Sequence, residues 1–264
     1  MSTPCELIIY STDKTKADKC AQAILVETKR LEKKYNYFDP DSFLSQINRR
    51  KTKDLDQESK TLLQRAIQYY HATNGIFDIT IATFKDLYTS TTNKEELEEK
   101  KQALLPYTGC EHLSMKKDKI IFDNEHTKID LGGFVKEYAV DRAIQILRKQ
   151  KFTSALVNYG GDIYALGIKP DKTKFTVGIK DPSNPQVYAR QLQLQDQALT
   201  TSASYERNTK IGDADYSHIL SKNKDASISN SVTVISHNCV ESGVYSTSLM
   251  IDETLKTNNQ VIYL

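Results

Sequence analysis

The 264-residue sequence lacks tryptophan and has only four cysteines. These cysteines, at positions 5, 20, 110 and 239, are far apart and include no C-x-x-C pair. His112 lies close to Cys110, but no second ligand pair stands nearby. The spacing therefore argues against a zinc site and against a disulfide framework, and it predicts free thiols in a reducing compartment.

Charge of one sign and long apolar runs are also missing. The 36 Lys and Arg residues nearly balance the 34 Asp and Glu residues, which gives a formal net charge of +2. Such a balance lacks the electrostatic footprint of a nucleic-acid-binding protein. No apolar stretch approaches the length of a membrane span, and no signal peptide or lipobox cysteine is present. We expect no nucleic-acid partner, no membrane span and a cytoplasmic location, unless an export signal has been removed.

Apolar periodicity divides the chain into a helix-rich first half and a strand-rich second half. After a strand over residues 5–10, it predicts helices over 16–35, 42–48, 57–72 and 94–105. It then predicts a late helix over 240–251, loops over 169–174 and 208–215, and strands over 119–122, 155–158, 175–179, 189–194, 197–201, 218–220, 232–235 and 260–263. Helices clustered before strands indicate the α+β class. No repeat or low-complexity linker divides the chain, so we expect a single domain over residues 1–264.

The segment over residues 130–142 is the most informative. Asp130 follows an apolar approach typical of a strand end, and Gly132-Gly133 then leads into a helix. A glycine turn at a helix start lets backbone N–H groups approach a phosphate closely. Lys136 lies in the first turn, where a cation opposes the helix dipole, so its position calls for a reason. The alternatives are a plain tight turn and a surface lysine on an amphipathic helix.

Further motifs occur in a fixed order around this segment. They lie at residues 1–10, 38–48, 73–80, 156–162, 201–207, 216–220 and 231–235. Together with the Asp130 segment, the series resembles the FAD:protein FMN transferases, the ApbE-like flavin transferases, from Met1 to about residue 249. The resemblance implies an ApbE-like α+β fold, with mixed or antiparallel sheets and flanking helices around a flavin-nucleotide cleft.

The activity implied by the resemblance is transfer of FMN from FAD to a Ser or Thr hydroxyl of an acceptor flavoprotein. A phosphoester forms, AMP leaves, and Mg²⁺ spreads the developing charge. His218, in a Tyr-Ser-His-Ile-Leu run, matches the family's histidine and is the expected catalytic base. A structural histidine bonded to nearby backbone is the alternative.

The same resemblance implies which residues bind the flavin nucleotide. They are Met1, Phe38, Ile76, Phe77, Asp78, Gly132, Gly133 and Lys136. Phe77 can contact a ring and Asp78 can accept a hydrogen bond from the nucleotide. Equally, Phe77 can belong to the core while Asp78 caps a helix.

For the metal, the resemblance implies the Ala139 carbonyl, Ser246 and Thr247 as ligands. Where relatives place an aspartate one turn before the threonine, this chain has Gly243. Mg²⁺ usually needs one or two carboxylates. We therefore expect Mg²⁺ to bind weakly or only together with FAD, and Gly243→Asp to strengthen binding. If another carboxylate has taken the role, Glu241 and Asp162 are the first to examine.

These departures leave the function open between three classes. The first is an active FMN transferase. The second is a flavin-binding pseudoenzyme, which is favoured by Gly243 and by residues 221–225, where the run after His218 differs from relatives. The third is an interaction protein without a ligand, which the retained glycine-rich segment disfavours.

Overall fold

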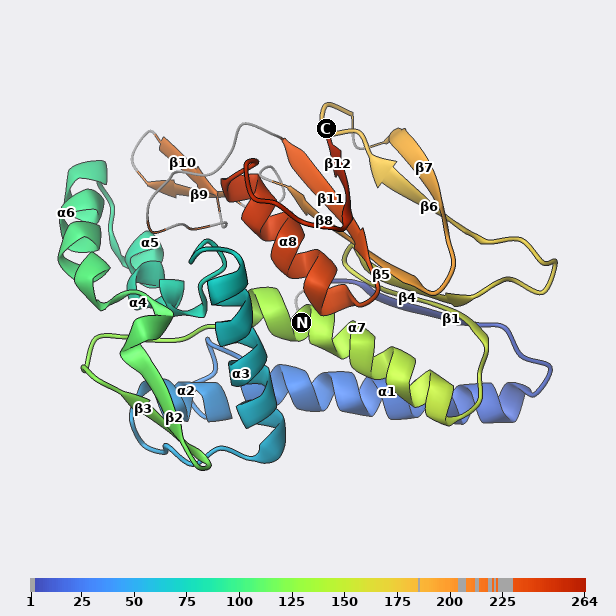
Figure 1. The fold of residues 1–264 in the computed structure, drawn as a ribbon, viewed down its shortest axis with the longest axis horizontal. Helices are drawn as coiled ribbons and strands as arrows, with labels where there is room; N and C mark the ends of the chain where they lie inside the picture. Colours follow the sequence, from blue (N-terminus) through green and yellow to red (C-terminus); the bar gives the residue numbers. More distant parts are fainter. Residues whose placement is uncertain are drawn as a thin grey trace.

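A computed structural model describes residues 3–184, 186–203, 208–211, 214–217, 220, 222 and 230–264. Its centre is a six-stranded antiparallel sheet in the order β1-β4-β5-β8-β11-β12 (Figure 1). These strands are β1 Cys5–Ile9, β4 Ser154–Tyr159, β5 Asp162–Gly167, β8 Gln197–Ala203, β11 Ser231–Ser236 and β12 Gln260–Tyr263.

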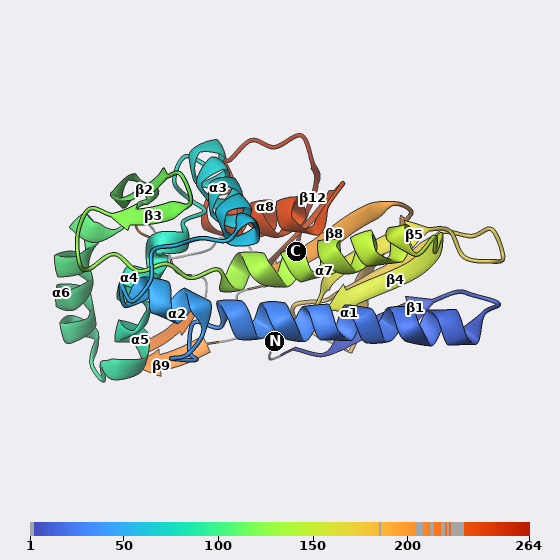
Figure 2. The same cartoon turned by 90° about the horizontal axis from the view of Figure 1, so that it is seen from below.

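Three helices cover one face of this sheet. They are α1 Lys14–Tyr35, α7 Gly132–Lys149 and α8 Cys239–Ile251. Helix α7 packs between α1 and α8 and also contacts β4 and β5, whereas α8 lies on β8 and β11 (Figure 2). Strand alternation explains this layering, because Ala155 and Val157 of β4 face the core beneath the helices and Leu156 faces the other side.

The hairpin of β6 Phe175–Lys180 and β7 Tyr188–Leu194 packs against the opposite face of the sheet. Its buried Phe175, Val177 and Ile179 form a second core cluster with residues of β5, β8, β11 and β12. The sheet is therefore buried on both faces, which accounts for the burial of most positions along β5 and of all positions along β11.

Smaller elements surround one end of the sheet. In chain order they are α2 Phe43–Asn48, α3 Gln57–Ala72, η1 Ile79–Ile81, α4 Ala82–Lys85, α5 Leu87–Ser90, α6 Lys94–Leu104, η2 Leu105–Tyr107, η3 Cys110–His112, the hairpin β2 Leu113–Lys116 and β3 Lys119–Phe122, and the hairpin β9 Asn208–Ile211 and β10 Ala214–Ser217. None of the described helices is both long and apolar enough to cross a bilayer.

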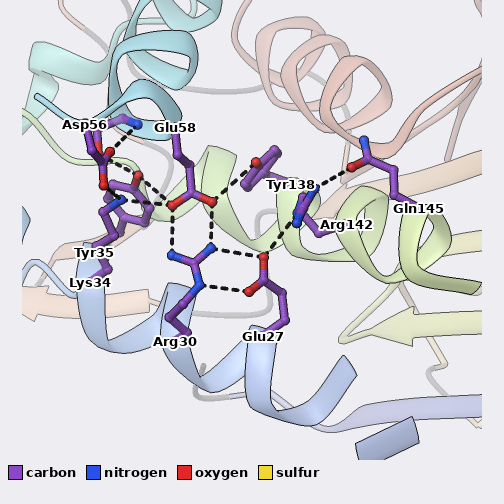
Figure 3. A network of polar contacts seen from close by, with 10 residues as sticks. Glu27, Arg30, Lys34, Tyr35, Asp56, Glu58, Tyr138, Arg142 and Gln145 are labelled. Carbon is purple, nitrogen blue, oxygen red and sulfur yellow. Dashed lines mark hydrogen bonds and ion pairs between the residues drawn. The ribbon is translucent and has the colours of Figure 1, made fainter. Parts of the chain in front are cut away.

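A network of ion pairs joins α1, α3 and α7 (Figure 3). Arg30 of α1 donates to Glu27 at 2.8 Å and to Glu58 of α3 at 2.6 Å. Arg142 of α7 donates to the same Glu27 at 3.1 Å. Lys34 adds a 2.9 Å contact to Glu58. Shared carboxylates held by several cations order these helices more firmly than isolated surface pairs do.

The α+β expectation is confirmed, and the predicted bounds of α3, β3 and β12 agree with the structure. The predicted loop over 208–215 is wrong, because it contains β9 and the start of β10. The short polar strand β2 and the buried strand β5 were not predicted. Of the strand predicted over 218–220, residues 218 and 219 lie outside the described part of the chain.

Candidate functional site

The start of α7 presents an open backbone surface. Asp130 accepts a hydrogen bond from the Gly132 N–H at 2.9 Å and pairs with Lys85. The next residue, Gly133, has φ −88° and ψ 21°, which interrupts the helical geometry at the first turn. A Cβ atom placed on Gly133 would meet no atom within 4 Å. This helix terminus is therefore accessible to a group that accepts backbone hydrogen bonds, such as a phosphate.

Phe38 lies beside this helix start. Its side chain is 73% exposed, which is unusual for an aromatic ring. Lys85 Nζ lies 4.7 Å from the ring centroid of Phe38 and 4.7 Å from that of Tyr37, and the same lysine pairs with Asp130. An exposed ring thus stands next to the open glycine turn, where a flat ligand can stack on it.

Lys136 forms an ion pair with Asp162, with 2.7 Å between Nζ and Oδ2. Asp162 is buried at the first position of β5, directly after the Gly160-Gly161 turn. Burial alone lowers the pKa of Lys136, but the carboxylates of Asp162 and Glu137 outweigh burial and raise that pKa. Lys136 is consequently a charged residue held one turn into α7, rather than the solvated surface lysine of the alternative interpretation.

Hydroxyl groups line the contact between β8 and α8. The Thr200 and Ser242 hydroxyls are 2.9 Å apart. Ser202 follows Thr200 by two residues and therefore lies on the same face of β8. Its hydroxyl lies 2.9 Å from that of Ser246 and 3.1 Å from that of Thr247. The structure therefore brings together Ser246 and Thr247, the two side chains expected at the metal, and adds Ser202, which the sequence analysis did not single out.

Glu137 is the residue that the sequence analysis missed. It lies on α7 opposite Gly243 of α8 and is only 5% exposed. A Cβ atom placed on Gly243 would lie 2.6 Å from Glu137 Cγ and 3.0 Å from its Oε1. Its Oε2 atom is buried and has no hydrogen-bond partner among the described residues. The sequence did contain a sign of this burial. Glu137 lies three and seven residues before Val140 and Ile144, so it falls on the apolar face of the predicted helix, where a carboxylate is unusual.

Burial raises the pKa of Glu137, and the nearby Asp162 carboxylate raises it further. Asp141, one turn later on α7, accepts hydrogen bonds from the Cys239 N–H at 2.7 Å and the Val240 N–H at 3.2 Å. Burial raises the pKa of Asp141 to about 6, although these two hydrogen bonds favour its ionised form. Asp141 thus fastens the N-terminus of α8 to α7 and fixes the position of Gly243 relative to Glu137.

Ile76, Phe77 and Asp78 are adjacent in sequence but lie in different environments. Phe77 is buried in the core beneath Tyr69, and Asp78 caps η1 by accepting from the Thr80 N–H at 2.8 Å. These are the core and cap roles of the alternative interpretation. Asp78 Oδ2 has no hydrogen-bond partner within the described part of the chain. Ile76 lines a cavity of about 500 Å³ with residues of 72–75, 222 and 251–256.

The remaining predicted site residues lie apart or outside the described ranges. Met1 and His218 are outside them, so the structure places neither. Ala139 is buried in α7. Glu241, one of the two carboxylates named as possible replacements for the missing metal ligand, accepts hydrogen bonds from the side-chain amides of Asn238 and Asn259, both at 3.3 Å. No group of three or more His, Cys, Asp or Glu side chains suited to a metal occurs among residues that the structure describes.

The comparisons with known proteins identify the family. The ApbE family model matches residues 1–260. The chain belongs to the ApbE family. An ApbE protein from Thermotoga maritima superposes with a TM-score of 0.88 at 27% identity, covering 99% of this chain and 90% of the other. A histidine-to-glycine variant of the flavin transferase ApbE from Vibrio cholerae superposes with a TM-score of 0.80 at 20% identity, covering 100% and 94%, which supports the shared fold alone.

Curated ApbE relatives carry the name FAD:protein FMN transferase. The one from Vibrio cholerae is 26% identical over 80% of this chain and 66% of its own length. The one from Klebsiella pneumoniae is 32% identical over 46% of this chain and 38% of its own length. The chain thus spans less than two thirds of the length of these curated relatives.

The surroundings of Gly243 bear on the expected effect of an aspartate at this position. An aspartate side chain at this position would begin with the Cβ atom that meets Glu137 Cγ at 2.6 Å. A single Gly243→Asp substitution therefore requires the Glu137 side chain to shift and places two carboxylates close together. The expected gain in Mg²⁺ binding stays a prediction.

Proposed function

We propose that this chain transfers FMN from FAD to a Ser or Thr hydroxyl of an acceptor protein. The phosphoryl group of the FMN half forms a phosphoester with the hydroxyl oxygen, the pyrophosphate bond breaks, and AMP leaves. The observation that carries the proposal is the ApbE family match over residues 1–260, together with curated relatives that are named for this reaction.

The start of α7 suits the pyrophosphate of FAD. The open N-terminal turn at Gly133 can donate backbone hydrogen bonds, and the partial positive charge of the helix terminus favours an anion. Lys136 keeps its charge through its pair with Asp162 and lies one turn further along. The exposed ring of Phe38 gives a flat surface for one of the two ring systems of FAD.

The residues present also fit the Mg²⁺ ion that the family implies. Candidate oxygen donors come from two helices. The Thr247 and Ser246 hydroxyls lie on α8 beside Ser202, and α7 carries the Glu137 Oε2 atom, which has no partner among the described residues, as well as the Ala139 carbonyl that the family resemblance implies. Mg²⁺ prefers such hard oxygen ligands. When bound, it would neutralise charge that develops on the phosphoryl oxygens.

His218 is the proposed general base that takes the proton of the acceptor hydroxyl. Replacing it with alanine should lower transfer by roughly 10²–10⁴-fold while FAD still binds. His237 is exposed in the turn between β11 and α8 and provides the matched control, so His237→Ala should transfer FMN normally. Equal transfer by both variants would remove His218 from the mechanism.

The direct test of the function mixes purified protein, FAD, MgCl₂ and an acceptor flavoprotein that carries a Ser or Thr target. Covalent flavin fluorescence on the acceptor and AMP release in equal amounts would support the transferase. Saturable FAD binding without AMP release, with several acceptors, would instead support the flavin-binding pseudoenzyme that Gly243 first suggested.

A further inference from the structure

A buried carboxylate and a glycine face each other across the contact between α7 and α8. Glu137 is 5% exposed, and its Oε2 atom has no hydrogen-bond partner among the described residues. Burying a polar atom without a partner costs free energy, and an apolar side chain of similar size would avoid that cost. The position is therefore explained by a ligand of the carboxylate better than by packing.

Gly243 needs an explanation of its own. A glycine inside a helix destabilises it by roughly 1 kcal/mol relative to alanine. Here the three atoms nearest to a Cβ on Gly243 all belong to Glu137, at 2.6 to 3.1 Å. Gly243 thus leaves open the space into which the Glu137 side chain extends.

Two hydroxyl side chains follow Gly243 on the same helix. Thr247 and Ser246 follow Gly243 by four and three residues, so they lie on the same face of α8. Ser202 of β8 contacts both hydroxyls at 3.1 and 2.9 Å. Thr247 is only partly buried, so solvent can reach these hydroxyl groups at its side chain.

Several charged groups act on the Glu137 carboxylate. Lys136 is its chain neighbour, Asp162 approaches from β5, and Asp141 lies one turn away on α7. Lys136 pairs with Asp162, so Glu137 has no cation of its own among the described residues. A divalent cation would supply the missing counter-charge.

We propose that Glu137 supplies the metal-binding carboxylate of this site and extends from α7 into the space that Gly243 leaves on α8. The ligand is Mg²⁺ or a similar hard divalent cation, which one or two carboxylates and neutral oxygens can hold. In this arrangement the carboxylate comes from α7, while Ser246 and Thr247 come from α8. The inference rests on the proposed function for the identity of the ion, and binding tests it without any transfer reaction.

The experiment titrates MgCl₂ into the full-length protein by isothermal calorimetry, without and with FAD and with no acceptor present. Glu137→Gln keeps the shape of the side chain and removes its charge. We expect it to weaken Mg²⁺ binding by about 10-fold to 100-fold, because even residues that only support metal ligands have effects of this size. Glu241→Gln, which removes a carboxylate from α8 itself, is the matched control and should keep wild-type affinity.

Melting temperature separates a ligand from a structural acid. Without Mg²⁺, Glu137→Gln should melt at or above the wild-type temperature, because it removes a buried charge, and it should lose the rise that Mg²⁺ causes in the wild type. Wild-type Mg²⁺ affinity in a folded Glu137→Gln would overturn the inference. Failure of FMN transfer by a wild type that binds Mg²⁺ through Glu137 would instead overturn the proposed function alone.

A double variant tests the shared position directly. Glu137→Gly combined with Gly243→Asp returns the carboxylate to α8 and removes the collision. It should recover Mg²⁺ affinity to within about tenfold of wild type, whereas Glu137→Gly alone should not. A folded double variant that binds no more tightly than Glu137→Gly would show that the two positions do not serve one site.

Discussion

The change in folding stability caused by Gly243→Ala should depend on the Glu137 side chain. Inside a helix, the change from glycine to alanine normally stabilises by about 1 kcal/mol. At Gly243 the added methyl group would lie 2.6 Å from Glu137 Cγ, and overpacking of this kind costs about 1–3 kcal/mol. We therefore expect a net loss of up to about 2 kcal/mol, which lowers the melting temperature by several degrees for a domain of this size.

The same substitution in a Glu137→Ala background should have the opposite sign. All three of the nearest atoms to the added methyl group belong to Glu137 beyond its Cβ, so truncation removes the collision. Only the gain in helix propensity remains, and Gly243→Ala should then stabilise by up to about 1 kcal/mol. The coupling between the two sites should reach about 1–3 kcal/mol.

Urea unfolding followed by far-UV circular dichroism measures all four proteins of this cycle. Gly133→Ala is the control, because its methyl group would meet nothing within 4 Å. It should change the free energy of unfolding by less than about 0.5 kcal/mol. The reasoning fails if Gly243→Ala is as stable as wild type, or if its effect is the same with and without the Glu137 side chain.

Three further predictions concern neighbouring residues. Asp162→Asn removes the partner of Lys136 and should destabilise by about 3 kcal/mol in urea unfolding, since it leaves a partly buried cation unpaired. Phe38→Ala should weaken FAD binding, measured by flavin fluorescence, by about 1–2 kcal/mol without lowering the melting temperature, because the ring is 73% exposed. For Asp141, the pKa is raised from 3.8 to about 6, so its contribution to stability is complete below pH 4 and is lost as pH rises to 6. Unfolding at several pH values should therefore show Asp141→Asn gaining up to about 3 kcal/mol relative to wild type across that window.

The sequence predicted those elements whose periodicity is strong and local. The helix over 57–72 has an apolar stripe and an Asp56 side chain that accepts from the Ser59 N–H at 2.9 Å, and its bounds were right. Strand β5 was missed because it is buried on both faces, so it shows no alternation. Strands β9 and β10 were missed because residues 208–215, which are mostly polar, were predicted as a loop.

Those features of the candidate site that come from a single sequence motif could be predicted. The Gly132-Gly133 turn at the start of a helix was visible in the sequence, and so was the placement of Gly243 one helical turn before Thr247. The partner of Lys136 was not, since Asp162 comes from a strand that follows a different turn. Phe77 and Asp78 pack in the core and cap η1, roles that the sequence had left open, and their contact with the nucleotide stays a prediction.

Glu137 and Gly243 show why a ligand can be missed when each position is read separately. Two helices that pack together share one space, and a carboxylate can enter it from either side. From α7 it needs the longer reach of glutamate and a residue without a side chain opposite, which the pair provides. With neither carboxylate the proposed site would lack an anionic ligand, and with both the two like charges would lie in contact. In the proposed site, Gly243 is thus the residue that leaves room for the Glu137 carboxylate.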